Sequence, residues 1–162
     1  MTKPLQPLCH PFVKTADVPD DLDIVIFALP SFTHELYLKA LKPYLKQGVT
    51  IGAMPAEGGF DLCAIHNLGS EFVRNSNLFS LETLPWACRI LEYGKKVEVL
   101  GTKKQVDLII SPKHGTTKQS VTNVLHDLIG RLPAFDQADN FLSDTLMNIN
   151  TNPRTRQPVT SK

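Results

Sequence analysis

The stretch Ser80–Arg89 concentrates side chains that can do chemistry. It reads Ser-Leu-Glu-Thr-Leu-Pro-Trp-Ala-Cys-Arg and contains a carboxylate, a guanidinium, the only Trp and one of the three cysteines. The residues Asn77–Leu81 predict a short strand, and Pro85 ends regular pairing because it has no N–H to donate. Loops that follow strands in α/β proteins often hold ligand-binding groups. The structural alternative is a strand end followed by a buried Trp, and one short motif leaves both open.

Two Cys–His pairs contain residue types that can bind a metal. Cys9-His10 and the pair Cys63 and His66 are separated by over fifty residues. Zinc sites need four ligands at characteristic spacings, so we predict no metal. Three cysteines is an odd number, which argues against a disulfide framework and favours a reducing, cytoplasmic setting.

Length and composition indicate one domain with its own core. The chain has 162 residues, 42% of them hydrophobic, with 12 prolines and a formal net charge of +1. Nearly balanced, scattered charge favours neither nucleic acid nor an anionic membrane as a partner. The apolar run Ile24–Leu29 is far too short to span a bilayer. Residues 1–15 carry several prolines and predict an irregular segment that resembles neither a signal peptide nor a transit peptide.

The first half of the chain predicts a parallel sheet flanked by helices. Strand Asp23–Leu29 is continuously apolar rather than alternating, which is typical of a strand covered on both faces. Pro43 should end or bend the helix that follows. The expected elements are strand Asp23–Leu29, helix His34–Lys46, strand Val49–Met54, helix Phe60–Leu68 and strand Asn77–Leu81.

Each of these three strands ends in a loop. The loops are Leu29-Pro30-Ser31, the run from Met54 to Gly59, and Glu82-Thr83-Leu84-Pro85. In open α/β sheets ligands bind in the crevice outside the carboxyl ends of the strands. This expected convergence is the strongest functional signal that the residues themselves carry.

The second half predicts a β-hairpin and two helices. Lys96–Leu100 alternates, and Val106–Ile110 follows it like the second arm of a hairpin. Helices are expected over Lys118–Ile129 and Ala134–Ile149, and a disordered tail over 151–162. No G-x-G-x-x-G loop occurs, and Gly58-Gly59 imitates that phosphate cradle only weakly.

The run Ser80–Lys103 resembles the opine dehydrogenases of marine invertebrates, the octopine and tauropine dehydrogenase group. Asp23–Pro30, the residues Phe32-Thr33-His34-Glu35, and Gly52–Phe60 are similar to strand–loop elements of the same family. The resemblance implies a Rossmann-like NAD-binding domain and an NADH-dependent reductive condensation of a 2-oxo acid, typically pyruvate, with an amino acid. It divides the chain into a partial NAD-binding domain over 16–110 and a helical exit over 111–150 toward the family's mainly helical domain.

Two departures from the family suggest that this chain corresponds to the middle of an enzyme and is inactive on its own. The chain begins just before what resembles the fourth strand, and the family's catalytic His-Pro pair falls on Asn152-Pro153. Asn is neither acid nor base at neutral pH, so no catalytic residue is predicted. Strand 23–29 becomes an open edge, for which we expect self-association. The alternatives are a non-catalytic remnant that binds a partner through this edge, and another dehydrogenase acting on hydroxy acids or polyol phosphates.

The resemblance also suggests site residues. Leu29 and Pro30 would border the cofactor, with Pro55, Gly58 and Gly59 near its nicotinamide end, and Thr83, Trp86 and Cys88 would border the substrate cleft. Each of these residues also has a structural alternative. Pro30 and Pro55 could simply end their strands, Trp86 could belong to the core, and Cys88 could be a small buried hydrophobic residue. His34, opening its helix, is expected to be a polar surface residue.

Overall fold

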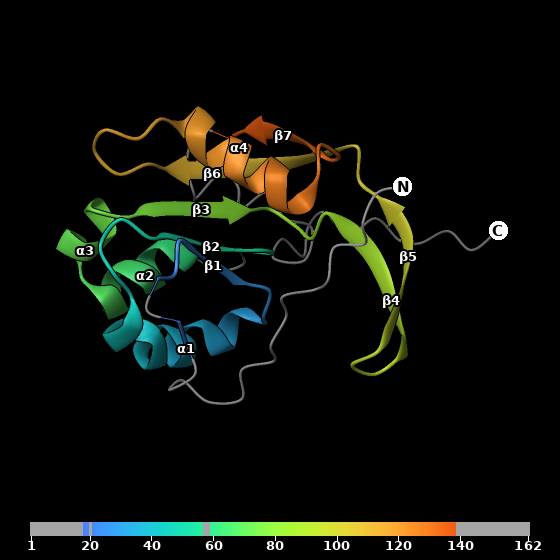
Figure 1. The fold of residues 1–162 in the computed structure, drawn as a ribbon, viewed down its shortest axis with the longest axis horizontal. Helices are drawn as coiled ribbons and strands as arrows, with labels where there is room; N and C mark the ends of the chain where they lie inside the picture. Colours follow the sequence, from blue (N-terminus) through green and yellow to red (C-terminus); the bar gives the residue numbers. More distant parts are fainter. Residues whose placement is uncertain (1–17, 20, 57–58, 139–162) are drawn as a thin grey trace, which may run out of the picture.

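Five strands form one mixed sheet in the order β1-β2-β3-β6-β7 (Figure 1). The computed structural model describes residues 18–19, 21–56 and 59–138. The strands of this sheet are β1 (Ile24–Phe27), β2 (Thr50–Ala53), β3 (Asn77–Leu81), β6 (Gln105–Ser111) and β7 (Ala134–Gln137). β1, β2 and β3 are mutually parallel, β6 is antiparallel to β3, and β7 is parallel to β6. The predicted α/β class with parallel strands is confirmed.

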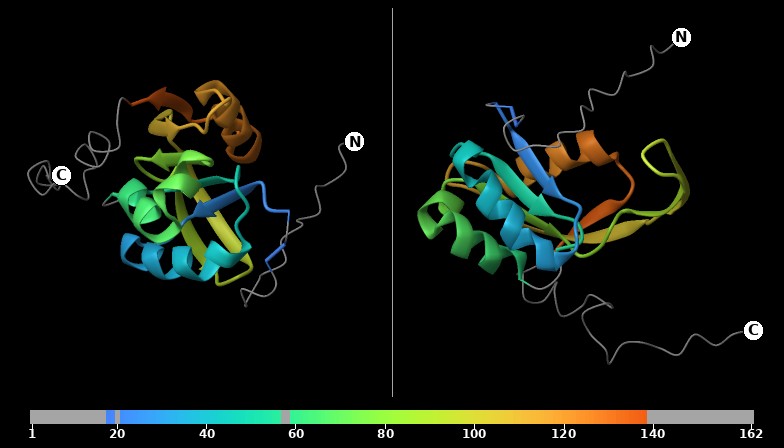
Figure 2. Two further views of the ribbon diagram at one scale, coloured as in Figure 1. Left: turned by 90° about the vertical axis from the view of Figure 1, so that its left-hand side faces the viewer. Right: turned by 90° about the horizontal axis from the view of Figure 1, so that it is seen from below.

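Helices cover both faces of the sheet (Figures 1 and 2). They are α1 (His34–Leu41), α2 (Phe60–Leu68), α3 (Ser70–Arg74) and α4 (Lys118–Ile129), with short 3-10 turns at Ser31–Thr33 and Lys42–Tyr44. α1 and α2 lie on one face and α4 on the other. α1 ends at Leu41, one residue before the 3-10 turn that contains Pro43, so the expected effect of this proline is confirmed.

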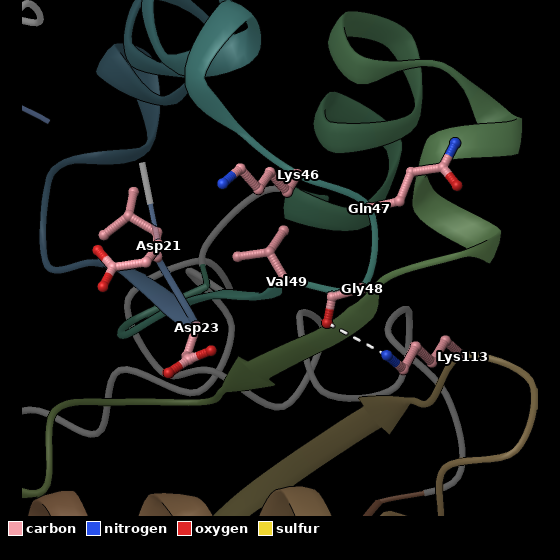
Figure 3. A pocket seen from close by; sticks show the side chains of 8 residues that line it. Asp21, Asp23, Lys46, Gln47, Gly48, Val49 and Lys113 are labelled. Carbon is pink, nitrogen blue, oxygen red and sulfur yellow. Dashed lines mark hydrogen bonds between the residues drawn. The ribbon is translucent and has the colours of Figure 1, made fainter. Parts of the chain in front are cut away.

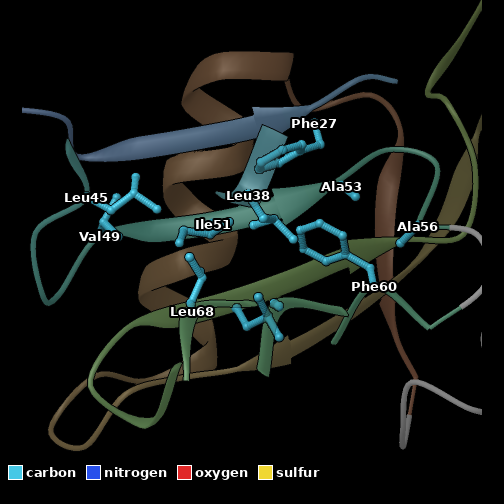
Figure 4. Close-up of a cluster of buried hydrophobic side chains, with 11 residues drawn as sticks. Phe27, Leu38, Leu45, Val49, Ile51, Ala53, Ala56, Phe60 and Leu68 are labelled. Carbon is cyan, nitrogen blue, oxygen red and sulfur yellow. The ribbon is translucent and has the colours of Figure 1, made fainter. Parts of the chain in front are cut away.

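Two apolar clusters fill the space between the sheet and these helices. On one face Phe27, Leu38, Ile51 and Phe60 pack together, drawn from β1, α1, β2 and α2 (Figure 4). On the other face β3 and β6 pack against α4, chiefly through the buried residues Phe79, Leu81, Leu108 and Leu125. Each fully buried side chain of this size contributes roughly 1.5–3 kcal/mol to folding.

β1 is the edge strand that the sequence predicts, and β2 is the only described strand that pairs with it. Its backbone bonds to β2 run through Asp23 and Phe27, whose carbonyls accept from Thr50 and Met54. Because bonding sides alternate along a strand, the N–H and C=O of Ile24 and Ile26 point to the open side.

The expected hairpin of Lys96–Leu100 with Val106–Ile110 is wrong. Instead β4 (Trp86–Glu92) and β5 (Lys96–Thr102) form an antiparallel pair that projects from the main sheet (Figure 1). The turn between them contains Gly94 at a φ of 71°, a conformation that glycine adopts without strain. Four apolar side chains of β6, those of Val106, Leu108, Ile109 and Ile110, are buried beside β3, which removes them from water better than an exposed hairpin arm would.

The expected helix Ala134–Ile149 is also wrong at its start, because Ala134–Gln137 forms β7. Parallel pairing with β6, which joins Gln105 to Ala134 and Leu108 to Gln137, outweighs the helical pattern. The remainder of that helix, the tail and residues 1–15 lie outside the described residues. Among the described helices, none combines the length and apolar character needed to cross a bilayer.

Candidate functional site

The loops that leave β1, β2 and β3 enclose one cavity of about 340 Å³. Because these strands are parallel, their carboxyl ends share one edge of the sheet. The lining residues are Ala28, Leu29 and Pro30 after β1, Met54 and Pro55 after β2, and Leu84 after β3. The convergence expected from the sequence is therefore present in the structure.

The first wall is held by hydrogen bonds from the start of α1. The Pro30 carbonyl accepts from Thr33 twice, from the backbone N–H at 2.9 Å and from Oγ1 at 2.7 Å. The Leu29 carbonyl lies 3.2 Å from Nε2 of His34. Two of the three cavity-lining residues after β1, Leu29 and Pro30, thus have carbonyls that are hydrogen-bonded by the residues that follow them.

The second and third walls are fixed from other strands. The Ala56 N–H donates to the Leu81 carbonyl at 2.9 Å and so ties the loop after β2 to β3. Lys103 binds the loop after β3 at two points: its Nζ donates to Thr83 Oγ1 and its backbone N–H to the Pro85 carbonyl, both at 2.9 Å. These two contacts lie on either side of Leu84, the residue that reaches the cavity.

The cavity is apolar, and its charged neighbours lie beside it. None of its lining residues has a titratable side chain, so the walls are suited to a flat apolar ring rather than to proton transfer. At the end of β3, burial raises the pKa of the Glu82 carboxyl, the negative charge of Asp107 raises it further, and Lys103 opposes the shift. A carboxyl group with a raised pKa therefore lies at the base of the third loop.

The predicted cofactor residues Leu29, Pro30 and Pro55 all line this cavity. Gly59 does not; it precedes α2 in the left-handed conformation, with φ 81° and ψ 50°. Gly58 lies outside the described residues. The structure brings the first three together, and their role toward a cofactor stays a prediction.

The predicted substrate residues Thr83, Trp86 and Cys88 follow β3 but do not line the cavity. Trp86 is half-buried and begins β4, whereas Cys88 is an exposed free thiol opposite Val99 on β5. The alternative of a buried Cys88 is therefore wrong in this structure. A substrate-binding role for the three residues stays a prediction.

Sequence reasoning missed Ala28, Met54 and Leu84 as lining residues and mistook His34. The signal was present for Met54 and Leu84, which lie in strand exits already identified, whereas Ala28 falls inside the predicted strand Asp23–Leu29, directly before the first exit. His34 is only 1% exposed, so the expectation of a surface residue is wrong. Within α1 the apolar residues Leu36 and Tyr37 are exposed, and His34 shares the buried face with Leu38, one turn further on.

A second hollow lies at the amino ends of β1 and β2, the end of these strands opposite the cavity (Figure 3). It measures about 260 Å³ and carries charges of both signs, from Asp21, Asp23, Lys46 and Lys113. Within the described residues no group of three or more His, Cys, Asp or Glu side chains is placed to hold a metal ion.

Comparisons with known proteins test the family resemblance. No family model matches the chain. Octopine dehydrogenase of Pecten maximus is 41% identical over 127 residues, which is 78% of this chain and 31% of that protein. Tauropine dehydrogenase of Arabella iricolor is 35% identical over 130 residues, 79% of this chain and 32% of the relative. The chain is a homologue of the opine dehydrogenases.

Solved structures agree with that homology. An octopine dehydrogenase structure with NADH and L-arginine matches this opine dehydrogenase homologue with a TM-score of 0.70 and 37% identity, over 78% of this chain and 31% of that one. D-mandelate dehydrogenase with NADH matches with a TM-score of 0.56 at 12% identity, over 81% of this chain and 39% of that one, a likeness of fold alone. The chain thus spans about a third of the length of the opine dehydrogenases that it matches.

Proposed function

We propose that this chain provides the nicotinamide side of the NAD(H) site of an opine dehydrogenase. The family reaction is the reductive condensation of a 2-oxo acid with an amino acid, and NADH, when bound, supplies the hydride. The observation that carries the proposal is the apolar cavity at the shared carboxyl edge of β1, β2 and β3. Homology to octopine and tauropine dehydrogenases supports it.

The residues present fit one half of the dinucleotide. Leu29, Pro30 and Met54 offer apolar walls against which a flat ring can pack. The phosphates are not provided for, because the whole chain lacks a G-x-G-x-x-G loop. In the proposed division, residues 16–110 bind the cofactor and residues 111–150 lead toward the substrate-selecting domain. We infer that the chain alone binds NADH weakly and does not turn over substrate.

Saturation-transfer NMR on the 162-residue chain tests this proposal, since it reports which protons of NADH touch the protein. We expect more saturation on the nicotinamide protons than on the adenine protons, with a dissociation constant around or above 1 mM, roughly −4 kcal/mol. Leu84→Trp should fill the cavity and abolish the signal. Leu128→Trp, on an exposed position of α4, is the matched control. Equal or absent saturation of the two rings in the wild-type chain would overturn the proposal.

A second candidate function is association through the open side of β1. The observation that favours it is the outward-facing backbone of Ile24 and Ile26 in a strand that carries no charge. Sedimentation velocity should show a concentration-dependent dimer. Ile26→Pro removes an outward N–H and should weaken the dimer, whereas Ile26→Ala matches the lost side chain and keeps the N–H. A monomer at all concentrations would exclude this function.

A further inference from the structure

His34 is a buried polar residue directly behind the first wall of the cavity. It is the first residue of α1 and is 1% exposed. Its ring lies edge-on to two phenylalanines, 5.8 Å from Phe27 of β1 and 5.2 Å from Phe60 of α2 (centroid to centroid). These two rings also contact each other at 5.5 Å and belong to the apolar cluster of that face (Figure 4). The imidazole is therefore held from three elements at once.

The contact of this ring with Leu29 has a defined direction. Nε2 of His34 lies 3.2 Å from the Leu29 carbonyl oxygen. A carbonyl oxygen only accepts, so Nε2 carries the proton and donates. The bond is partly buried, and an apolar side chain of the same size would leave the Leu29 carbonyl without this donor. The hydrogen bond thus selects the position of the Leu29 backbone.

Leu29 joins this hydrogen bond to the cavity. It lines the cavity with its neighbours Ala28 and Pro30, whereas His34 is not among the lining residues. Phe27 and Phe60 hold the imidazole ring of His34 in place. Because this ring binds the Leu29 carbonyl, it also fixes the loop that follows β1. An apolar residue at position 34 could keep the contacts with Phe27 and Phe60 but would lose the donor to Leu29.

We propose that His34 is a positioning residue for the nicotinamide side of the cavity. Its Nε2–H holds the Leu29 carbonyl, and through it the wall formed by Leu29 and Pro30, at the place where the ring of the ligand would lie. The identity of the ligand in this inference rests on the proposed function. The hydrogen bond and the fixed wall do not depend on it.

Two substitutions separate the donor from the packing. His34→Gln carries an amide N–H close to the place of Nε2, and His34→Leu fills similar space without a donor. His66→Leu, on an exposed position of α2, is the matched control. The readouts on the 162-residue chain are the ¹⁵N shifts of the His34 ring, the ¹³C shift of the Leu29 carbonyl, and the saturation of the nicotinamide protons of NADH.

We expect the His34 ring to be protonated at Nε2. The Leu29 carbonyl resonance should move in His34→Leu and return toward its wild-type position in His34→Gln. The saturation of the nicotinamide protons should fall at least threefold in His34→Leu alone. A ring protonated only at Nδ1, or an unchanged Leu29 resonance in His34→Leu, would overturn the positioning role. Equal loss in the Gln and Leu variants would also overturn it, because the residue would then act by packing. If wild-type chain shows no nicotinamide saturation, the proposed function fails while the carbonyl shift still decides the role of His34.

Discussion

Substitution of Gly52 by alanine should be among the most damaging small changes in this fold. Gly52 lies in the middle of β2, opposite Phe79 of β3. A Cβ placed on Gly52 would lie 2.3–2.4 Å from three carbons of the Phe79 ring. Contact between carbon atoms is favourable only at about 3.5–4.0 Å, so the ring would have to move by more than an ångström.

The size of the effect follows from where Phe79 lies. It is fully buried at 0% exposure in the cluster that packs β3 and β6 against α4. Close-packed interiors have no room for such a shift, and overpacking typically costs about 1–3 kcal/mol, occasionally more. Since the clash involves three ring atoms, we expect the upper end, about 3 kcal/mol, out of roughly 5–15 kcal/mol for a whole domain.

Urea unfolding followed by circular dichroism measures this difference. Gly101→Ala in β5 is the matched control, because nothing lies within 4 Å of its Cβ position. Phe79→Ala removes all three clashing ring carbons, so the double variant should be more stable than the sum of the single effects by at least about 1 kcal/mol. A loss below about 1 kcal/mol in Gly52→Ala, or strict additivity with Phe79→Ala, would refute the reasoning.

Three further predictions concern a helix cap, a buried amide and a carboxyl group. Thr117→Ala removes the side chain that accepts from the first turn of α4 and should cost about 1 kcal/mol, with Thr117→Ser as the control in thermal unfolding. Asn77→Leu leaves Thr50 Oγ1 without its 3.1 Å partner and should cost about 2 kcal/mol in urea unfolding, whereas an effect near zero would contradict the buried bond. Burial, and then Asp107, raises the pKa of Glu82 above its ordinary 4.5, so the folded state binds the proton more tightly and stability falls as pH rises through that range. Glu82→Gln should therefore be more stable than wild type at neutral pH and lose this advantage below about pH 4, and a constant difference across the titration would argue against the shift.

The exits of the parallel strands could be predicted from the sequence because their signals are local. Continuous apolar runs identify buried parallel strands, and prolines mark where pairing ends. The bounds of α2, Phe60–Leu68, agree with the sequence prediction, since Gly59 and Gly69 flank it. With three parallel strands in order, the meeting of their loops follows from topology alone, whereas the choice of Leu29, Pro30 and Pro55 as cofactor residues came from the family resemblance.

The remaining errors come from interactions between distant parts of the chain. The arms Lys96–Thr102 and Gln105–Ser111 are separated by two residues, yet they pair with β4 and β3 instead of with each other. The pairing partner of each arm depends on which other strand offers a buried edge. The alternation of apolar and polar residues within the arm contains no information about that strand. His34 was misjudged for the same reason, because only its aromatic neighbours in β1 and α2 make its burial favourable.

The cavity illustrates how lining residues without chemical groups can still form a defined site. Its walls are apolar, and the hydrogen bonds that fix them are made just outside it. His34 holds the first loop, the Ala56–Leu81 bond holds the second and Lys103 holds the third. Lys103 directly follows β5, so the projecting hairpin and the third wall are fixed together. It follows that Lys103→Met, which keeps the stem and removes the ammonium donor, should disturb Leu84 and the cavity more than an apolar exchange at Leu84 itself.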